Sequence, residues 1–269
     1  MRIAFTKMHG LGNDFVVLDT RETAMPAIGA DTVRALADRT RGIGCDQLIV
    51  LENDPNATVR MRIYNSDGGE VEACGNAARA IGLLLKQKAT IATAGGLIAT
   101  VPDADGIAVD MGEPRFEWDA IPLAYPMDTA ALPVGWDMLE QPAAVNVGNP
   151  HVIFFVDNTD AVPLENLGSQ IETDPLFPDR INVNVAHVAD RKTLHLRVWE
   201  RGVGLTRACG TGACATAIAA MRRGLTERHV TVHLPGGALS IAWGEDNRIT
   251  MTGPAAEAFR GSFDWGDYA

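Results

Sequence analysis

The chain contains an internal repeat, and this feature limits its possible folds more than any other. Residues 59–76 (VRMRIYNSDGGEVEACGN) align without a gap with residues 194–211 (LHLRVWERGVGLTRACGT), 135 positions later. Two shorter pairs match in the same order: 12–13 with 148–149, and 90–96 with 231–237. A solenoid needs about three or more repeats. The repeat therefore predicts two related domains, which suits a chain of 269 residues.

Both copies of the repeat have the same local pattern. Apolar side chains alternate with polar ones over 59–64 and 194–199, which is the period of a β-strand. A glycine-rich connector, the tripeptide Ala-Cys-Gly and a helical run of small residues follow. Because these helices carry few bulky side chains, we expect a sheet to wrap closely around each one. The predicted fold class is α+β, with two pseudo-symmetric tandem domains, each a mostly antiparallel sheet around a central helix.

The boundary between the domains is expected where prolines are frequent. The segment 116–142 contains four of them and is interpreted as the linker. We therefore place the N-terminal half at 1–117 and the C-terminal half at 118–257. Additional helices are expected at 31–40 and 164–170.

Charge and hydropathy restrict the partners. With 23 Lys+Arg and 34 Asp+Glu, the formal charge is −11, which argues against nucleic acid or an anionic membrane surface as the main partner. No apolar stretch approaches the roughly 20 residues of a membrane span, and the first residues lack a signal-peptide pattern. We expect a cytoplasmic protein with reduced cysteines. The four cysteines form no C-x-x-C pair and the histidines show no ligand spacing, so no metal site is predicted.

Cys74 and Cys209 occupy equivalent places, where a glycine-rich loop enters a helix. Backbone N–H groups and the positive end of the helix dipole lie there, which lowers a thiol pKa and attracts carboxylates. If the two halves face each other, one thiol can act as base and the other as acid on a carbon beside a carboxylate. Racemases usually recruit pyridoxal phosphate. The four lysines lie in no evident cofactor motif, so we expect no cofactor.

Other residues are weighed against plain structural roles. A single cysteine is more often a small buried side chain than a catalyst, and we assign that role to Cys45 and Cys214. Asn65 and Glu200 end equivalent strands, nine residues before each repeated cysteine. Neutral Asn65 in one half, and Glu200 with Arg201 in the other, would suit an unsymmetrical substrate. An exposed Glu200–Arg201 ion pair of little energetic value is an equal alternative.

Longer motifs resemble the diaminopimelate epimerase family over essentially the whole chain. They are 7–19 (KMHGLGNDFVVLD), 41–50 (RGIGCDQLIV), 64–80 (YNSDGGEVEACGNAARA), 147–156 (VGNPHVIFFV), 180–188 (RINVNVAHV) and 200–215 (ERGVGLTRACGTGACA). The resemblance implies cofactor-free interconversion of LL- and meso-diaminopimelate, in lysine and peptidoglycan precursor synthesis. It also implies a homodimer and a C-terminal tail, 258–269, that returns to the first domain.

The resemblance also implies roles for single residues. Cys74 and Cys209 would be the acid/base pair, and His151 and Glu200 would adjust the thiol pKa values. The substrate would be bound by Asn13, Gln47, Asn65, Gly75, Asn76, Asn149, Asn182, Glu200, Arg201, Gly210 and Thr211. Without the resemblance, Asn13 and Asn149 could be simple turn residues.

Three other functions remain open. A proline racemase-like enzyme of the same fold would also use two thiols, although Glu200, Arg201 and the asparagines suit a substrate with a second amino-acid end. The four residues between Cys74 and Arg79 are one short of the loop of a thiol phosphatase. A binding protein without activity would not need both cysteines as thiols. A pH-dependent reaction with an alkylating agent would separate this last reading from the enzymes.

Overall fold

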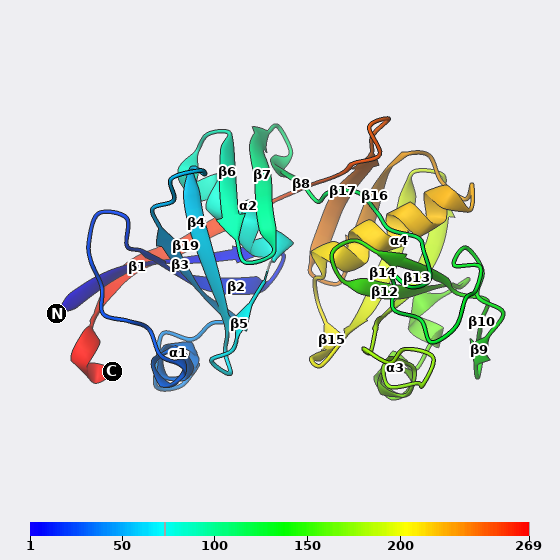
Figure 1. Cartoon of the computed structure of the whole chain (residues 1–269), viewed down its shortest axis with the longest axis horizontal. Coiled ribbons are helices and arrows are strands. Elements are labelled where there is room, and N and C mark those ends of the chain that lie inside the picture. The colour runs from blue at the N-terminus through cyan, green and yellow to red at the C-terminus, as the bar shows by residue number, and fades with distance from the viewer. Residues whose placement is uncertain (73, 269) are drawn as a thin grey trace. The chain divides into compact units, whose positions relative to one another are not determined.

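The structure is a computed structural model that describes residues 1–72 and 74–268. The chain forms two compact units (Figure 1). Unit 1 comprises Met1–Val109 and Gly253–Ala269, and unit 2 comprises Asp110–Thr252. Each unit combines a mixed sheet with a small number of helices, so the predicted α+β class is confirmed.

Unit 1 is built from strands of both ends of the chain. Its helices are α1 (Ala30–Ala37), α2 (Gly75–Leu85) and the 3-10 turn η2 (Trp265–Asp267). Its strands are β1 (Arg2–Gly10), β2 (Asn13–Asp19), β3 (Gln47–Glu52), β4 (Val59–Asn65), β5 (Glu70–Val71), β6 (Ala89–Thr93), β7 (Gly96–Asp103), β8 (Gly106–Asp110) and β19 (Ala256–Asp264). The last strand, β19, pairs antiparallel with the first, β1, from Arg2 opposite Asp264 to His9 opposite Ala256.

Unit 2 repeats this order of elements. Its helices are α3 (Leu164–Glu172), α4 (Gly210–Arg222) and the 3-10 turn η1 (Thr159–Ala161). Its strands are β9 (Gly135–Trp136), β10 (Leu139–Glu140), β11 (Ala143–Asn146), β12 (Pro150–Phe155), β13 (Asn182–Asp190), β14 (Thr193–Glu200), β15 (Gly204–Thr206), β16 (His229–Leu234), β17 (Gly237–Trp243) and β18 (Ile249–Gly253).

Strand directions agree between the units. The pair β2–β3 is parallel, as is β12–β13. Strand β4 runs antiparallel to β3 and parallel to β6, and β14 has the same relation to β13 and β16. The repeat found in the sequence therefore extends to the order and direction of the strands.

Helices α2 and α4 lie inside the curve of their own sheets, as the small side chains predict. Helix α4 packs against β11, β12, β13, β14, β16 and β17, and its alanines, among them Ala213 and Ala217, are fully buried. In unit 1, a Cβ on Gly82 would lie only 2.7 Å from Ile107 Cγ2. Any larger residue at this position would push helix α2 away from the sheet.

Helices α1 and α3 correspond to those expected at 31–40 and 164–170. In unit 2, Val183 and Val185 of β13 join the apolar core that contains α3. The residue between them, Asn184, bonds to residues of α4 instead. Because alternate residues of a strand point to opposite faces, α3 and α4 cover opposite faces of this sheet.

The segment 116–142 is not the linker that its prolines predict. Its side chains Ile121, Leu123 and Leu132 are buried in the core of unit 2. The prolines exclude regular structure over much of the segment, but they do not prevent packing. The two units change over at 109–110 and 252–253, and the limits expected at 117 and 257 stay a prediction. Across residues 1–72 and 74–268, the helices are too short or too polar to span a membrane.

Candidate functional site

Cys209 precedes helix α4 and occupies its N-cap position. The backbone of Cys209 is extended (φ −131°, ψ 109°), and the Gly212 N–H donates a hydrogen bond to the sulfur at 3.3 Å. The Thr211 hydroxyl lies 3.5 Å from the same sulfur. The Cys209 side chain is buried. The first turn of the helix therefore directs hydrogen-bond donors toward this thiol.

Glu200, the last residue of β14, lies directly against Cys209. The thiol donates to Glu200 Oε2 at 3.1 Å, and the Thr206 hydroxyl donates to Oε1 at 2.6 Å. Glu200 is thus a partner of the thiol and not half of an exposed ion pair. Burial raises the pKa of the Glu200 carboxyl above its ordinary value. The raised pKa makes this carboxylate more basic than that of an ordinary glutamate.

The thiol pKa of Cys209 is raised well above its ordinary value, chiefly by burial and then by the charge of Glu200. The position at a helix start predicts a lowered thiol pKa, and for Cys209 that prediction is wrong. Loss of water and an adjacent negative charge both disfavour the thiolate, and here they outweigh the donated hydrogen bonds. The surroundings of Cys209 therefore favour the protonated thiol over the thiolate.

Cys74 occupies the same position before helix α2, again with an extended backbone (φ −149°, ψ 114°). Its sulfur lies 4.0 Å from Asn13 Oδ1, within hydrogen-bond reach of a thiol, and Asn76 Nδ2 donates to the same oxygen at 3.3 Å. The Cys74 side chain is half-buried. Cys74 therefore faces a neutral amide where Cys209 faces a carboxylate.

His151 of β12 is fully buried between two asparagines. Its Nδ1 lies 3.2 Å from Asn184 Oδ1, and its Nε2 lies 2.9 Å from the terminal amide of Asn149. Burial lowers the pKa of His151 to about 4, so the imidazole is neutral at pH 7. Asn184 also donates to the carbonyl of Gly212, so it connects His151 to the helix start that carries Cys209.

Gln47 and Asn65 are opposite each other on β3 and β4. Gln47 Nε2 donates to Asn65 Oδ1 at 2.9 Å, while Gln47 Oε1 is buried and has no hydrogen-bond partner among the described residues. A buried acceptor without a partner costs about 1–3 kcal/mol. Such an atom is a candidate contact for a donor group of a ligand.

Asn182 fixes the loop that follows β14. Its Oδ1 accepts from the backbone N–H of Arg201 at 3.0 Å, and its Nδ2 donates to the carbonyl of Pro150 at 2.8 Å. The exposed guanidinium of Arg201 donates to the carbonyl of Asp179 at 2.9 Å. This contact uses one Nη1 donor and leaves the planar fork able to bind a carboxylate.

The structure thus divides the expected site residues into two groups, one in each unit. Unit 1 holds Asn13, Gln47, Asn65, Cys74, Gly75 and Asn76, and unit 2 holds Asn149, His151, Asn182, Glu200, Arg201, Cys209, Gly210 and Thr211. Gly75 and Gly210 are the first residues of their helices. The catalytic and binding roles of all of these residues stay predictions.

Several polar residues that contact the expected site residues were not predicted from the sequence. Asn184 contacts His151, and Thr206 contacts Glu200. Asp46 accepts a hydrogen bond from the Asn13 amide at 3.0 Å. A buried polar residue in an apolar strand was a signal for Asn184. A lone charge in a helix of small residues was a signal for Arg79, whose Nη2 donates to Asn76 Oδ1 at 2.8 Å. Asp46 lies beside Gln47 in one of the motifs quoted above, but the sequence does not show its partner.

One cavity of unit 2 lies away from these residues. A cavity of about 540 Å³ in unit 2 is lined by Asp157, His187, His195, Arg197 and other residues, and none of the expected site residues lines it. Over the described part of the chain, no group of three His, Cys, Asp or Glu side chains is placed to hold a metal ion.

Comparison with known proteins decides the family. The family model described as diaminopimelate epimerase matches residues 5–117 and 143–257. The diaminopimelate epimerase of Erythrobacter litoralis (strain HTCC2594) is 67% identical over 269 residues, covering 100% of both chains. The chain belongs to the diaminopimelate epimerase family. A second family member, from Rhizorhabdus wittichii, is 61% identical over 98% of this chain and 96% of that protein.

Solved structures extend the fold beyond the diaminopimelate epimerase family. A phenazine biosynthesis protein of the PhzF family from Enterococcus faecalis matches with a TM-score of 0.72 and 14% identity, over 98% of this chain and 100% of that one. A probable proline racemase from Agrobacterium radiobacter matches with a TM-score of 0.69 and 13% identity, over 98% and 93%. At this identity the likeness shows the fold alone.

Proposed function

We propose that this chain interconverts LL- and meso-diaminopimelate with its own thiols and without a cofactor. Membership in the diaminopimelate epimerase family carries the choice of substrate. The placement of Cys74 and Cys209 at matching helix starts supports the choice of mechanism. A member of this family is an isomerase, and its reaction inverts one α-carbon of the substrate.

In the proposed reaction, the two thiols act on opposite faces of that carbon. One cysteine, as thiolate, takes the α-proton, and the electron pair of the broken C–H bond moves into the adjacent carboxylate group. The other cysteine, as thiol, then gives its proton to the opposite face. After one turnover the protonation states of the two sulfurs are exchanged, and the reverse reaction begins from that state.

Each unit supplies groups that suit these steps. The backbone N–H groups of Gly75, Asn76, Gly210 and Thr211 would hold the reacting carboxylate and stabilise its extra charge as the proton leaves. Glu200 accepts a hydrogen bond from the Cys209 thiol and could take its proton, which would convert a thiol of raised pKa into a base.

The remaining residues would recognise the distal amino-acid end, where no chemistry occurs. Arg201 offers a planar fork for a carboxylate, and the unpartnered Gln47 Oε1 offers an acceptor for an ammonium group. Asn65 accepts from Gln47 and would align this acceptor. A substrate with two amino-acid ends accounts for both kinds of group. We further propose a cytoplasmic homodimer that binds this small molecule, with neither nucleic acid nor membrane as a partner.

Proton exchange in heavy water tests the proposal. With LL-diaminopimelate, we expect the meso product to carry a solvent deuterium at the inverted carbon from the first turnovers, while the remaining substrate keeps its protium. Deuterium entering the substrate as fast as the product would indicate a single base and contradict the two-thiol mechanism. A parallel assay with L-proline tests the proline racemase-like alternative, which predicts racemisation of proline and no conversion of diaminopimelate.

A further inference from the structure

The side chain of Asn13 lies in a chain of hydrogen bonds between two charged groups, all within unit 1. Arg79 Nη2 donates to Asn76 Oδ1 at 2.8 Å, and Asn76 Nδ2 donates to Asn13 Oδ1 at 3.3 Å. Asn13 Nδ2 then donates to Asp46 Oδ2 at 3.0 Å. We call these four residues the Asn13 relay.

The charges at the ends give the relay one direction. A guanidinium has only donors and a carboxylate has only acceptors, whereas an amide has both and can turn over. Arg79 therefore requires the oxygen of Asn76, and Asp46 requires the N–H group of Asn13. Both conditions are met when Asn13 Oδ1 points toward Asn76 and the Cys74 thiol. Arg79 is fully buried and Asn76 nearly so, so water does not compete at that end of the relay.

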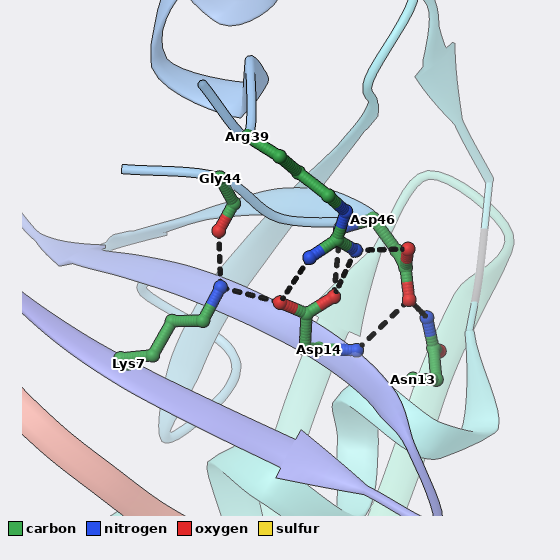
Figure 2. A network of polar contacts seen from close by, with 6 residues as sticks. All are labelled: Lys7, Asn13, Asp14, Arg39, Gly44 and Asp46. Carbon is green, nitrogen blue, oxygen red and sulfur yellow. Dashed lines mark hydrogen bonds and ion pairs between the residues drawn. The ribbon is translucent and has the colours of Figure 1, made fainter. Parts of the chain in front are cut away.

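A network of ion pairs holds the Asp46 end in place (Figure 2). Arg39 Nη2 donates to Asp46 Oδ1 at 2.6 Å and to Asp14 Oδ1 at 2.6 Å, while the backbone N–H of Asp14 donates to Asp46 Oδ2 at 3.1 Å. Lys7 donates to Asp14 and to the carbonyl of Gly44. Burial raises the pKa of Asp14, but the hydrogen bonds from Arg39 and Lys7 outweigh it and hold the value at about 2. The Asp14 carboxylate therefore stays ionised at any pH at which the enzyme would work.

We infer that Asp46 and Arg79 are positioning residues that keep the oxygen of Asn13, and not its N–H groups, turned toward the Cys74 thiol. The inference rests on the proposed function, in which Cys74 gives and takes the α-proton. An oxygen at this place accepts from the S–H group and favours the protonated thiol. A reversed amide would present N–H donors and favour the thiolate, so Cys74 would lose its action as an acid.

Reversing the relay tests the inference. In Asp46→Asn, a single amide oxygen remains as acceptor for three donors: Arg39, the backbone N–H of Asp14 and the Asn13 amide. In Asn76→Asp, a carboxylate oxygen faces Asn13 Oδ1. The double variant keeps the net charge and accommodates a reversed Asn13, because residue 76 now accepts and residue 46 donates. We expect each single variant to lower the Tm, and the double variant to recover part of that loss. Epimerisation by the double variant stays at least about tenfold below wild type.

Each outcome is informative. Recovery of both Tm and kcat in the double variant would show that the direction of Asn13 is irrelevant to the reaction and overturn the inference. If the Tm of the double variant falls by the sum of the two single-variant losses, the relay has no fixed direction. This result would also overturn the inference. Asp19→Asn is the matched control, because Asp19 ends β2, the strand that begins at Asn13. Among the described residues, the Asp19 side chain bonds to Arg21. The control variant should keep wild-type kcat. An inactive wild type would refute the proposed function, while the Tm pattern would still report on the relay.

Discussion

The cysteines at the two helix starts share their backbone and position but differ in the group that faces the sulfur. Both residues are extended and precede a helix of small residues. Cys209 is buried and donates to the carboxylate of Glu200, whereas Cys74 is half-buried and faces the amide of Asn13. The duplication has kept the backbone that presents each thiol, while the surrounding side chains have diverged. A helix start alone therefore does not set the pKa of a thiol, because the facing side chain and the access of water also contribute.

Removing either sulfur is the strongest test of whether one helix start supplies the acid and the other the base. Cys74→Ala and Cys209→Ala should each reduce interconversion of LL- and meso-diaminopimelate by roughly 10²–10⁴-fold or more, since inversion needs both an acid and a base. Initial rates with purified variants measure this. Cys45→Ala, at a buried cysteine of unit 1, is the control and should keep most of its activity. Near-normal turnover by Cys74→Ala or by Cys209→Ala would contradict the two-base mechanism.

Removing the carboxylate that distinguishes the Cys209 start is expected to have the next largest effect. Glu200→Gln should lower kcat by roughly 10²-fold, because the Cys209 thiol loses its proton acceptor. The negative charge of Glu200 raises the pKa of Cys209, so its loss should shift alkylation of Cys209 to lower pH. Peptide mapping after timed alkylation follows each cysteine separately.

Alkylation of Cys74, followed in the same samples, is the internal control for Glu200→Gln. Its pH dependence should not change. An unchanged Cys209 profile would show that burial alone governs this thiol and would remove the distinction between the two helix starts.

The loop after each strand end offers a smaller test. Arg201 follows Glu200 in unit 2, where unit 1 has Ser66 after Asn65. Arg201→Lys keeps the charge but loses the planar fork, so we expect kcat/KM to fall by roughly tenfold, mainly through KM. Steady-state kinetics with meso-diaminopimelate measure the effect. A variant equal to wild type would place the distal carboxylate elsewhere.

The last prediction concerns stability and not activity. The repeat places His151 opposite Phe15, and both are fully buried. The pKa of His151 is lowered from 6.5 to about 4 in the folded chain, so the unfolded chain binds the proton more readily. Its contribution to stability is complete above pH 6.5 and falls by about 1.4 kcal/mol per pH unit down to about pH 4. His151→Gln should unfold with a flatter dependence on pH over this range.

Urea unfolding at several pH values compares His151→Gln with wild type. Parallel curves for the two proteins would mean that the His151 imidazole binds its proton equally well in the folded and unfolded chains. At pH 8 the variant should be the less stable one, because glutamine cannot reproduce both contacts of the ring.

The sequence was informative where a pattern is local or repeated. Alternating side chains predicted β4 and β14, and small residues predicted that α2 and α4 lie within their sheets. The tripeptides around Cys74 and Cys209 pointed to two helix starts because the comparison of two copies separates retained residues from the background. Motifs shared with the family were enough to name the expected site residues, whose roles are predictions.

What the sequence did not reveal depends on contacts between distant segments and on burial. Asp46 meets Asn13 across 33 positions, and no spacing rule relates the two. The raised pKa of Cys209 follows from its enclosure and from Glu200, neither of which a helix-start argument includes. Prolines in 116–142 correctly excluded regular structure over much of the segment, but packing of Ile121 and Leu132 is a property of the folded unit.

The pairing of β1 with β19 has a consequence for synthesis on the ribosome. All of unit 2 lies between the two portions of unit 1 in the chain, so unit 2 emerges before unit 1 can be completed. At about 5–20 residues per second, β1 waits on the order of ten seconds for its partner, with one edge unpaired. Nascent chains of this protein therefore expose a strand edge of unit 1 during this interval, and an unpaired edge of this kind can pair with another chain.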